Sequence, residues 1–289
     1  MKKMKITEII SAEKPSLSFE VFPPKTSDKF ETVEKAALEI ADLKPSYMSV
    51  TYGAGGGTSK FTADIAEHIL KRGVTPLAHL TCISSTRDMV RKQLELLKEK
   101  GIENILALRG DIPAGADLSN RSYRYASDLM KEIDEFGGFC IGGACYPENH
   151  PDSPDSDSDI ESLRIKAESG CRFLTTQMFF DNNVLYNFMY RLLRRGVDIP
   201  VIAGIMPVTS ASQIKRICSI SKSALPQRFL RIVDRYGDKP EAMKQAGIAF
   251  ATEQIIDLYA NGINAVHVYS MNKPDVAAAI KSNLSEIIA

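Results

Sequence analysis

The sequence predicts one α/β domain, residues 1–289, folded as a (β/α)8 (TIM) barrel. Eight short apolar segments recur along the chain, and segments with helical spacing and charged faces lie between them. Nearly continuous apolar runs of this length are typical of parallel strands that are buried on both faces. Eight strand–helix units in 289 residues correspond to about 36 residues each, which suits a barrel of ~250 residues with some insertions.

The predicted elements alternate regularly. Strands are predicted at 17–22, 47–52, 76–82, 104–110, 139–146, 173–179, 200–206 and 265–270. Helices are predicted at 30–43, 60–71, 89–97, 122–136, 159–169, 182–195, 210–221 and 275–287. In the first helix, Val33, Ala36, Ala37 and Ile40 have the i, i+3, i+4, i+7 spacing of one apolar face. Glycines at 73, 101, 137, 138, 170, 196 and 262 are typical of helix C-termini.

Two segments depart from this alternation. The segment 207–264, between the seventh and eighth strands, is the longest insertion and is expected to be helical. The segment 151–159, PDSPDSDSD, is expected to be a loop that supplies helix-capping residues. The prediction is therefore a single-domain barrel with a helical insertion between strands seven and eight.

An open, doubly wound sheet is the structural alternative. That fold often carries G-x-G-x-x-G after its first strand, whereas the first strand here continues into FPPKTSDKF. Only the segment 53–58, GAGGGT, comes near the pattern, and its last position is threonine. The G-K-[ST] of a P-loop is missing from it as well, so these comparisons favour the barrel.

The composition narrows the class of partner. The 36 Lys and Arg balance 36 Asp and Glu, and 44% of the residues are apolar. These values exclude a disordered chain and a polybasic nucleic-acid-binding arm. Glu8 and Glu13 interrupt the N-terminal segment, and no apolar run approaches the ~20 residues that span a bilayer. The five cysteines are an odd number without a C-x-x-C pair, which favours reduced thiols in the cytoplasm.

Polar residues gather where the predicted strands end, which is the end of a barrel that carries the chemistry of barrel enzymes. They are Glu20 in strand one, Thr51 and Tyr52 after strand two, His79 and Thr81 in strand three, Arg109, Gly110 and Asp111 after strand four, the segment 146–150 after strand five, Gln177 in strand six and Tyr269 in strand eight. We therefore expect a site at this end of the barrel.

Three of these features carry the chemical argument. Glu20 interrupts an apolar strand, so burial is expected to raise the pKa of its carboxyl group towards that of a general acid; the alternative is an ion pair with Arg109. His79 fits equally well as a residue of the site and as a hydrogen-bonded histidine of the core. Gly110, between Arg109 and Asp111, allows the backbone to approach a ligand closely.

Common barrel chemistries lack their signatures here. No H-x-H follows the first strand, which counts against a metal-dependent amidohydrolase, and no metal site is expected. The sixth strand has no lysine to form a Schiff base, which counts against a class I aldolase. The chain has no tryptophan to stack on sugars, which counts against a glycosidase. The residues alone leave the reaction open.

Ordered sequence blocks carry a family resemblance over about residues 15–275. They are SFEVFPPKT (18–26), SVTYGAGG (49–56), AHLTC (78–82), ALRGD (107–111), YASDL (125–129), YPENHP (146–151), TTQMFFD (175–181), GIMPV (204–208) and HVYSMN (267–272). In this order they resemble the bacterial-type methylenetetrahydrofolate reductases. The resemblance implies a barrel that holds FAD without a Rossmann motif, in a one-carbon pathway that serves methionine biosynthesis.

The resemblance also implies a mechanism. NADH or NADPH would give a hydride to FAD and leave, and 5,10-methylenetetrahydrofolate would then accept the hydride in a ping-pong sequence. Glu20 matches the general acid that protonates the folate N10, and Asp111 matches an aspartate beside flavin and folate. The residues matched to substrate contacts are Thr51, Gln177, Gln213 and Lys273. Those matched to FAD contacts are Tyr52, Ala54, His79, Arg109, Gly110, Asp111, Tyr125, Ala126, Tyr146, His150, Asp159, Ser162 and Lys166.

Several positions depart from the family pattern. Ile165 stands where an arginine near the FAD is typical, Ser162 replaces an asparagine, Lys273 replaces a folate-contacting arginine, and Ile217 replaces a phenylalanine that covers the nicotinamide. These changes make the electron donor the least determined feature. One alternative is a flavin-bearing subunit that receives electrons from a partner protein, and another is a lyase or aldolase without flavin. The family is often homo-oligomeric, so we expect a homo-oligomer.

Overall fold

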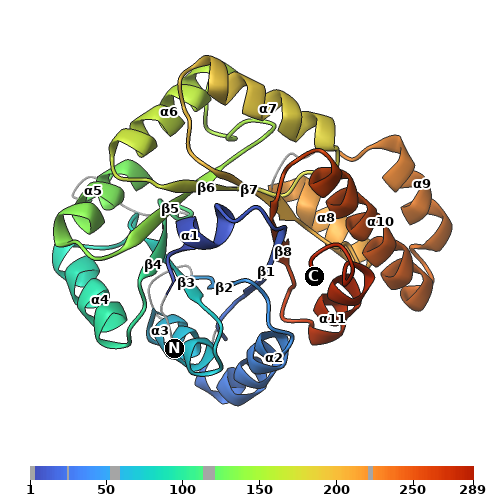
Figure 1. Cartoon of the computed structure of the whole chain (residues 1–289), viewed down its shortest axis with the longest axis horizontal. Coiled ribbons are helices and arrows are strands. Elements are labelled where there is room, and N and C mark those ends of the chain that lie inside the picture. The colour runs from blue at the N-terminus through green and yellow to red at the C-terminus, as the bar shows by residue number, and fades with distance from the viewer. Residues whose placement is uncertain (1–3, 25, 53–58, 113–120, 221–223) are drawn as a thin grey trace.

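The computed structural model describes residues 4–24, 26–52, 59–112, 121–220 and 224–289. In them, eight parallel strands pair in sequence order and close into a barrel, as predicted (Figure 1). The strands are β1 (Ser16–Val21), β2 (Met48–Val50), β3 (Pro76–Thr81), β4 (Asn104–Leu108), β5 (Cys140–Cys145), β6 (Phe173–Thr176), β7 (Val201–Ile205) and β8 (Ala265–Tyr269). Each lies within a predicted strand or differs from it by one residue at the start.

Helices surround this barrel (Figure 1). They are α2 (Phe30–Asp42), α3 (Ser59–Lys71), α4 (Arg87–Glu99), α5 (Ala126–Phe136), α6 (Ser156–Glu168), α7 (Asn182–Arg194), α8 (Ala211–Ile220), α9 (Gln227–Tyr236), α10 (Pro240–Ala260) and α11 (Pro274–Asn283), with a short 3₁₀ helix η1 (Ser27–Lys29) before α2. Of these, α8, α9 and α10 lie between β7 and β8. The helix predicted from 122 begins later, because the Asp128 carboxylate accepts bonds from the backbone N–H groups of Arg124 and Tyr125 and caps the helix there.

The acidic segment 151–159 supplies a helix cap as predicted, but its second half is helical, because α6 begins at Ser156 and not at the predicted residue 159. Asp155, in the acidic segment 151–159, is the N-cap of α6, and its carboxylate accepts a hydrogen bond from the Ser158 backbone N–H at 2.7 Å. Asp157 and Asp159 lie in the first turn of the same helix, where negative charge is favourable. The segment therefore fixes where α6 begins, and α6 supplies residues to the site described below.

The sequence did not predict α1 (Ile6–Ile10), which closes the amino-terminal end of the barrel. Its Ile6 is fully buried in a cluster formed by one residue from each of six strands and by the residue that precedes β2. The cluster residues are Leu77, Leu106, Cys140, Phe173, Ile202, Ala265 and Tyr47. The Ile6 backbone N–H donates to the Asn104 side chain at 2.9 Å. Figure 1 shows α1 lying across the barrel mouth. Among the described residues, α1 and this cluster therefore fill the amino-terminal end of the barrel with apolar side chains.

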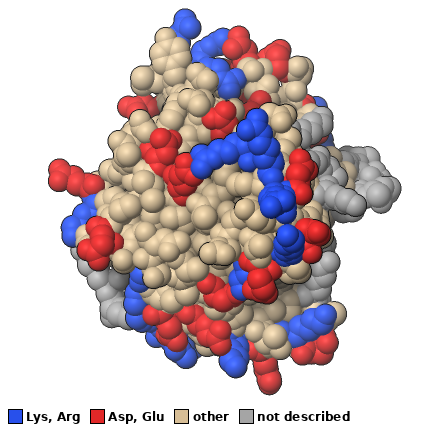
Figure 2. All heavy atoms as spheres, turned by 90° about the vertical axis from the view of Figure 1, so that its right-hand side faces the viewer, with Lys and Arg blue, Asp and Glu red and all other residues tan. Residues whose placement is uncertain are grey.

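The surface agrees with the balanced composition. On the face shown in Figure 2, basic and acidic side chains are intermingled and separated by uncharged surface. Among the described residues, no helix is both long enough and apolar enough to span a membrane. The four cysteines whose side chains the structure describes, Cys82, Cys140, Cys145 and Cys171, are buried free thiols; Cys218 lies outside the described side chains.

Helix α10 approaches the backbone after β7 at Gly247. A Cβ atom built on Gly247 would lie 1.9 Å from the carbonyl oxygen of Val208. We expect Gly247→Ala to lower the free energy of unfolding by about 1–3 kcal/mol, although alanine has the higher helix propensity. Thermal unfolding followed by circular dichroism should show a melting temperature lower by about 2–10 °C.

The control is Ala249→Gly, an exposed position two residues along α10. It should lower the stability by only about 1 kcal/mol, the difference in helix propensity. A melting temperature that rises in Gly247→Ala would show that α10 does not pack this closely on Val208.

Candidate active site

A cavity of about 800 Å³ lies at the carboxyl ends of the strands, where the sequence predicted a site. Of the predicted residues, those that line it are Glu20, Thr51, Tyr52, His79, Arg109, Gly110, Asp111, Tyr125, Ala126, Tyr146, His150, Asp159, Ser162, Lys166 and Gln177. Ala54 lies outside the described residues. Gln213 and Lys273 are not among the lining residues, whereas Ile83, Met89, Met206 and Met271 are and were not predicted.

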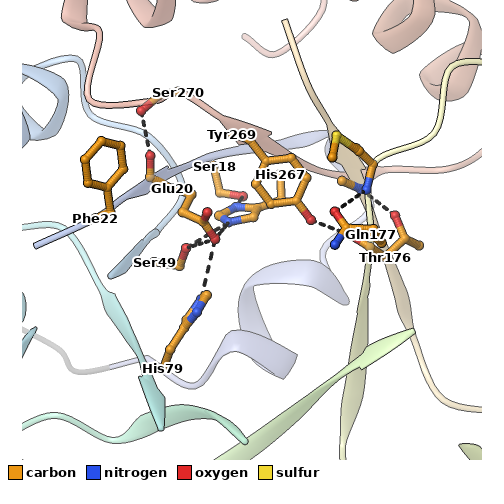
Figure 3. A network of polar contacts seen from close by, with 12 residues as sticks. Ser18, Glu20, Phe22, Ser49, His79, Thr176, Gln177, His267, Tyr269 and Ser270 are labelled. Atoms are coloured by element: carbon orange, nitrogen blue, oxygen red, sulfur yellow. Dashed lines mark hydrogen bonds and ion pairs between the residues drawn. The ribbon is translucent and has the colours of Figure 1, made fainter. Parts of the chain in front are cut away.

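Glu20 lies in the cavity wall at the centre of a polar network (Figure 3). The strand register places Glu20 beside Ser49 of β2 and Tyr269 of β8. Its Oε2 atom is 3.4 Å from the Ser49 hydroxyl, 3.6 Å from His79 Nε2 and 3.9 Å from His267 Nε2. The carboxyl group therefore has three polar neighbours on one oxygen, and Arg109 is not one of them.

His267 connects two serine hydroxyls beneath Glu20. Ser18 donates its one proton to the Val266 carbonyl at 2.9 Å, so its 2.8 Å contact with His267 Nδ1 requires an N–H on that nitrogen. His267 Nε2 is 2.9 Å from Ser49. A neutral imidazole accepts the Ser49 proton there, and a protonated imidazole leaves Ser49 to donate to Glu20. Ser49 therefore links the Glu20 carboxyl group to the His267 ring.

The expectation that Glu20 has a raised pKa is wrong for this structure. Burial does raise the pKa, and it is the largest single influence. The contacts with His267, His79 and Ser49 stabilise the carboxylate by more, so the pKa of Glu20 lies below its ordinary value. The sequence argument treated Glu20 as isolated because His267 and Ser49 belong to strands far away in the sequence.

His79, by contrast, is held neutral. Its side chain is 7% exposed, and burial lowers its pKa to about 4. Its Nε2 is buried without a hydrogen-bond partner among the described residues, which is uncommon for a polar atom inside a protein. The ring lines the cavity, so a bound ligand could supply the missing partner.

The β4 end combines a cation with an approachable backbone. Arg109 forms an ion pair with Asp152 at 2.9 Å, which replaces the pairing with Glu20 considered as an alternative. Gly110 has φ +86°, a conformation that favours glycine, and a Cβ there would lie 3.1 Å from the Thr81 side chain. Asp111 follows in an exposed position on the cavity wall.

The β5–α6 side of the cavity holds further polar groups. Asp159 is buried at 5% exposure and accepts bonds from the His150 backbone N–H and the Ser153 hydroxyl. The Tyr146 ring meets the His150 ring edge-on, with centroids 4.6 Å apart. Lys166 donates to the Ala144 carbonyl at 2.6 Å, and burial lowers its pKa. This side therefore offers an aromatic face, a cation and an imidazole together.

The β6 and β8 ends close the cavity on its remaining side. Gln177 Oε1 accepts from the Met178 backbone N–H at 2.9 Å, and the Tyr269 hydroxyl donates to the Thr176 carbonyl at 2.5 Å (Figure 3). Tyr269 fits because its neighbour Gly204 has no side chain; a Cβ there would lie 2.5 Å from the Tyr269 hydroxyl oxygen. Tyr269 therefore forms part of the wall beside Glu20.

The two remaining predicted residues meet at Thr209. Gln213 Oε1 accepts from the backbone N–H groups of Thr209 and Ser210 and so caps the start of α8. Lys273 Nζ donates to the Thr209 hydroxyl at 2.8 Å. In this structure both side chains stabilise the loops after β7 and β8.

Comparison with known proteins assigns the family. Residues 5–285 match the family model for methylenetetrahydrofolate reductase. The 5,10-methylenetetrahydrofolate reductases of Pectobacterium carotovorum and Escherichia coli are each 34% identical over 266 residues, covering 92% of this chain and 88% and 89% of theirs. A Clostridium thermocellum protein, solved as binding two copies of 5-methyl-5,6,7,8-tetrahydrofolic acid, has the same fold, with a TM-score of 0.66, 14% identity and coverage of 98% and 99%. The chain belongs to the methylenetetrahydrofolate reductase family.

Proposed function

We propose that this chain is an FAD-dependent reductase that converts 5,10-methylenetetrahydrofolate to 5-methyltetrahydrofolate with NADH or NADPH. Residues 1–289 would form the single FAD-binding catalytic domain. The observation that carries the proposal is the position of Glu20, a carboxyl group that is hydrogen-bonded through Ser49 to His267 on the wall of a large cavity. The names of the relatives supply the substrate class.

The cavity residues fit a flavin dinucleotide. The cavity volume of about 800 Å³ lies in the range of pockets that bury sizeable ligands. Arg109 and Lys166 supply positive charge for a diphosphate, Tyr146 supplies an aromatic face, and Gly110 allows a ligand to approach the backbone. His79 Nε2 is a buried polar atom in need of a partner. FAD, when bound, would accept a hydride from the nicotinamide and pass it to the folate in alternating half-reactions.

We propose that the remaining predicted FAD contacts bind the cofactor from the same cavity wall. Tyr125 and Ala126, at the start of α5, and Asp159 and Ser162, on α6, would hold the nucleotide portion. Tyr52 and His150 would lie beside them, with Ala54 in the segment after Tyr52. All except Ala54 line the cavity.

Glu20 would protonate N10 of the folate, so that the five-membered ring opens to a cationic iminium that can accept hydride. Ligands that displace water from the cavity would strengthen the burial that already raises the pKa of this carboxyl group. The route through Ser49 to His267 would then return the proton to Glu20. Asp111 would stabilise the cation by its charge, and Thr51, Gln177, Gln213 and Lys273 would contact nicotinamide or folate.

An anaerobic spectrum tests this proposal. Purified protein, reconstituted with FAD where necessary, should show a flavin band near ~450 nm that bleaches with NADH or NADPH and returns when methylenetetrahydrofolate is added. A flavin that neither nucleotide bleaches would instead favour the subunit fed by a partner protein. Absence of FAD binding would overturn the proposed function and favour a reaction without flavin.

A further inference from the structure

The turn after β8, residues 270–273, has an unusual backbone. Met271 and Asn272 have φ of 54° and 53°, so two consecutive residues other than glycine adopt the left-handed conformation. Asparagine tolerates this conformation better than most residues, but methionine is disfavoured in it. Such a backbone persists only where surrounding contacts hold it in place, and it is frequent beside active sites.

The turn is closed by its own bond from the Lys273 backbone N–H to the Ser270 carbonyl at 3.0 Å. Its side chains bond to the carboxyl end of β1 and to the loop after β7. The Ser270 hydroxyl donates to the Glu20 carbonyl at 2.6 Å. The Asn272 side chain accepts from the Phe22 backbone N–H and donates to the Phe22 carbonyl, both at 2.9 Å. Lys273 reaches Thr209. Figure 3 shows the Ser270 contact beside the Glu20 network.

These bonds continue the pairing of two strands beyond their ends. The last register pair between β1 and β8 is Glu20 with Tyr269. Past this pair, the Asn272 amide group bonds to both the N–H and the carbonyl of Phe22. It thereby satisfies the two backbone groups that a neighbouring strand would otherwise pair. Glu20 is therefore fixed at its own carbonyl and again two residues later.

The same turn reaches the cavity. Met271 lines the cavity together with Glu20, and the left-handed backbone at Met271 and Asn272 sets its direction. With this backbone, Met271 lines the cavity while the Asn272 side chain bonds to Phe22. The unusual conformation thus serves two contacts at once.

We propose that Asn272, with Ser270, is a positioning residue that fixes the carboxyl end of β1 and so orients Glu20 towards the folate. The effect on catalysis rests on the proposed function, whereas the effect on the backbone at the end of β1 does not. Asn272 does not itself line the cavity, and its side-chain hydrogen bonds go to Phe22, so it acts on Glu20 through the Phe22 backbone.

Asn272→Gly is the decisive variant, because glycine adopts the left-handed backbone readily and lacks the side chain whose amide group bonds to Phe22. Asn264→Gly is the matched control: Asn264 precedes the other end of β8 and donates to the Glu13 carbonyl. Amide hydrogen exchange, followed by NMR on ligand-free protein, should be at least about tenfold faster at Phe22 in Asn272→Gly than in wild type or the control. Unchanged exchange at Phe22 would show that Asn272 does not hold the Phe22 backbone, whatever the protein catalyses.

The catalytic consequence is measured on FAD-loaded protein in the two half-reactions separately. In Asn272→Gly, reduction of methylenetetrahydrofolate at saturating substrate should slow on the order of tenfold, while flavin reduction by the nicotinamide changes less than about twofold. Asn272→Asp retains the acceptor for the Phe22 N–H and should recover part of the rate. Equal losses in both half-reactions, or no loss in either, would exclude a role in positioning Glu20. If no flavin binds, the proposed function fails. The exchange result would still decide whether Asn272 holds the Phe22 backbone.

Discussion

Glu20→Gln should slow the reduction of methylenetetrahydrofolate by roughly 10²–10⁴-fold, the usual contribution of a general acid. Glutamine has the same shape and can still bond to Ser49, but it holds no transferable proton. Flavin reduction by NADH or NADPH needs no proton at N10, so its rate should change by no more than about threefold. Stopped-flow absorbance of the flavin under anaerobic conditions measures the two half-reactions separately.

The matched control for this prediction is Glu39→Gln. Glu39 is an exposed residue of α2 whose closest recorded cation, Lys35, is 4.0 Å away. It should leave both half-reactions unchanged, since surface ion pairs contribute little. If Glu20→Gln slowed both half-reactions equally, Glu20 would have a structural role or a role in holding the flavin instead of acting as the acid.

Lys166→Met should weaken FAD binding by roughly 10–100-fold, the value of a hydrogen bond to a charged group. Methionine retains the length of the side chain and removes the charge that we assign to the diphosphate. Burial already lowers the pKa of Lys166, so removal of this cation should leave the ligand-free protein as stable as wild type, or more stable. Fluorescence titration with FAD and thermal unfolding of the ligand-free protein test the two expectations.

Lys100→Met is the matched control, for which we expect a loss of stability without a loss of FAD affinity. Lys100 lies outside the cavity lining and bonds to Glu67 at 2.6 Å and Asp64 at 3.0 Å. Its removal should lower the melting temperature and leave FAD affinity unchanged. If Lys166→Met bound FAD as tightly as wild type, Lys166 would have no contact with the diphosphate, and Arg109 would be the cation to test next.

Much of the site could be predicted from the sequence because a barrel places the end of every strand at the same rim. Glu20, His79 and Arg109 follow one another at strand ends along the chain, and all three line one cavity. Lys166 and Asp159 were placed there by resemblance to the family, and they also line it. The prediction depended on counting strands correctly, not on knowing any contact between them.

The electrostatic state of Glu20 could not be predicted in this way. His267 stands in a strand whose apolar pattern gives no reason to select it, and its partners Ser18 and Ser49 lie 249 and 218 residues away in sequence. A serine within a strand has many possible partners until the register is fixed. The sign of the pKa shift at Glu20 therefore depended on the register of β1 with β2 and β8.

The sequence by itself determined the alternation of strands and helices, the caps of helices such as α6, and the end of the barrel where the cavity forms. These features follow from residues within one or two helical turns of each other, so local spacing encodes them. Only the tertiary structure decided that α1 closes the opposite end, that His267 and Ser49 lie beside the Glu20 carboxyl group, and that Asn272 holds the Phe22 backbone. Each of these joins residues that only barrel closure brings together, because closing the sheet places its first strand beside its last.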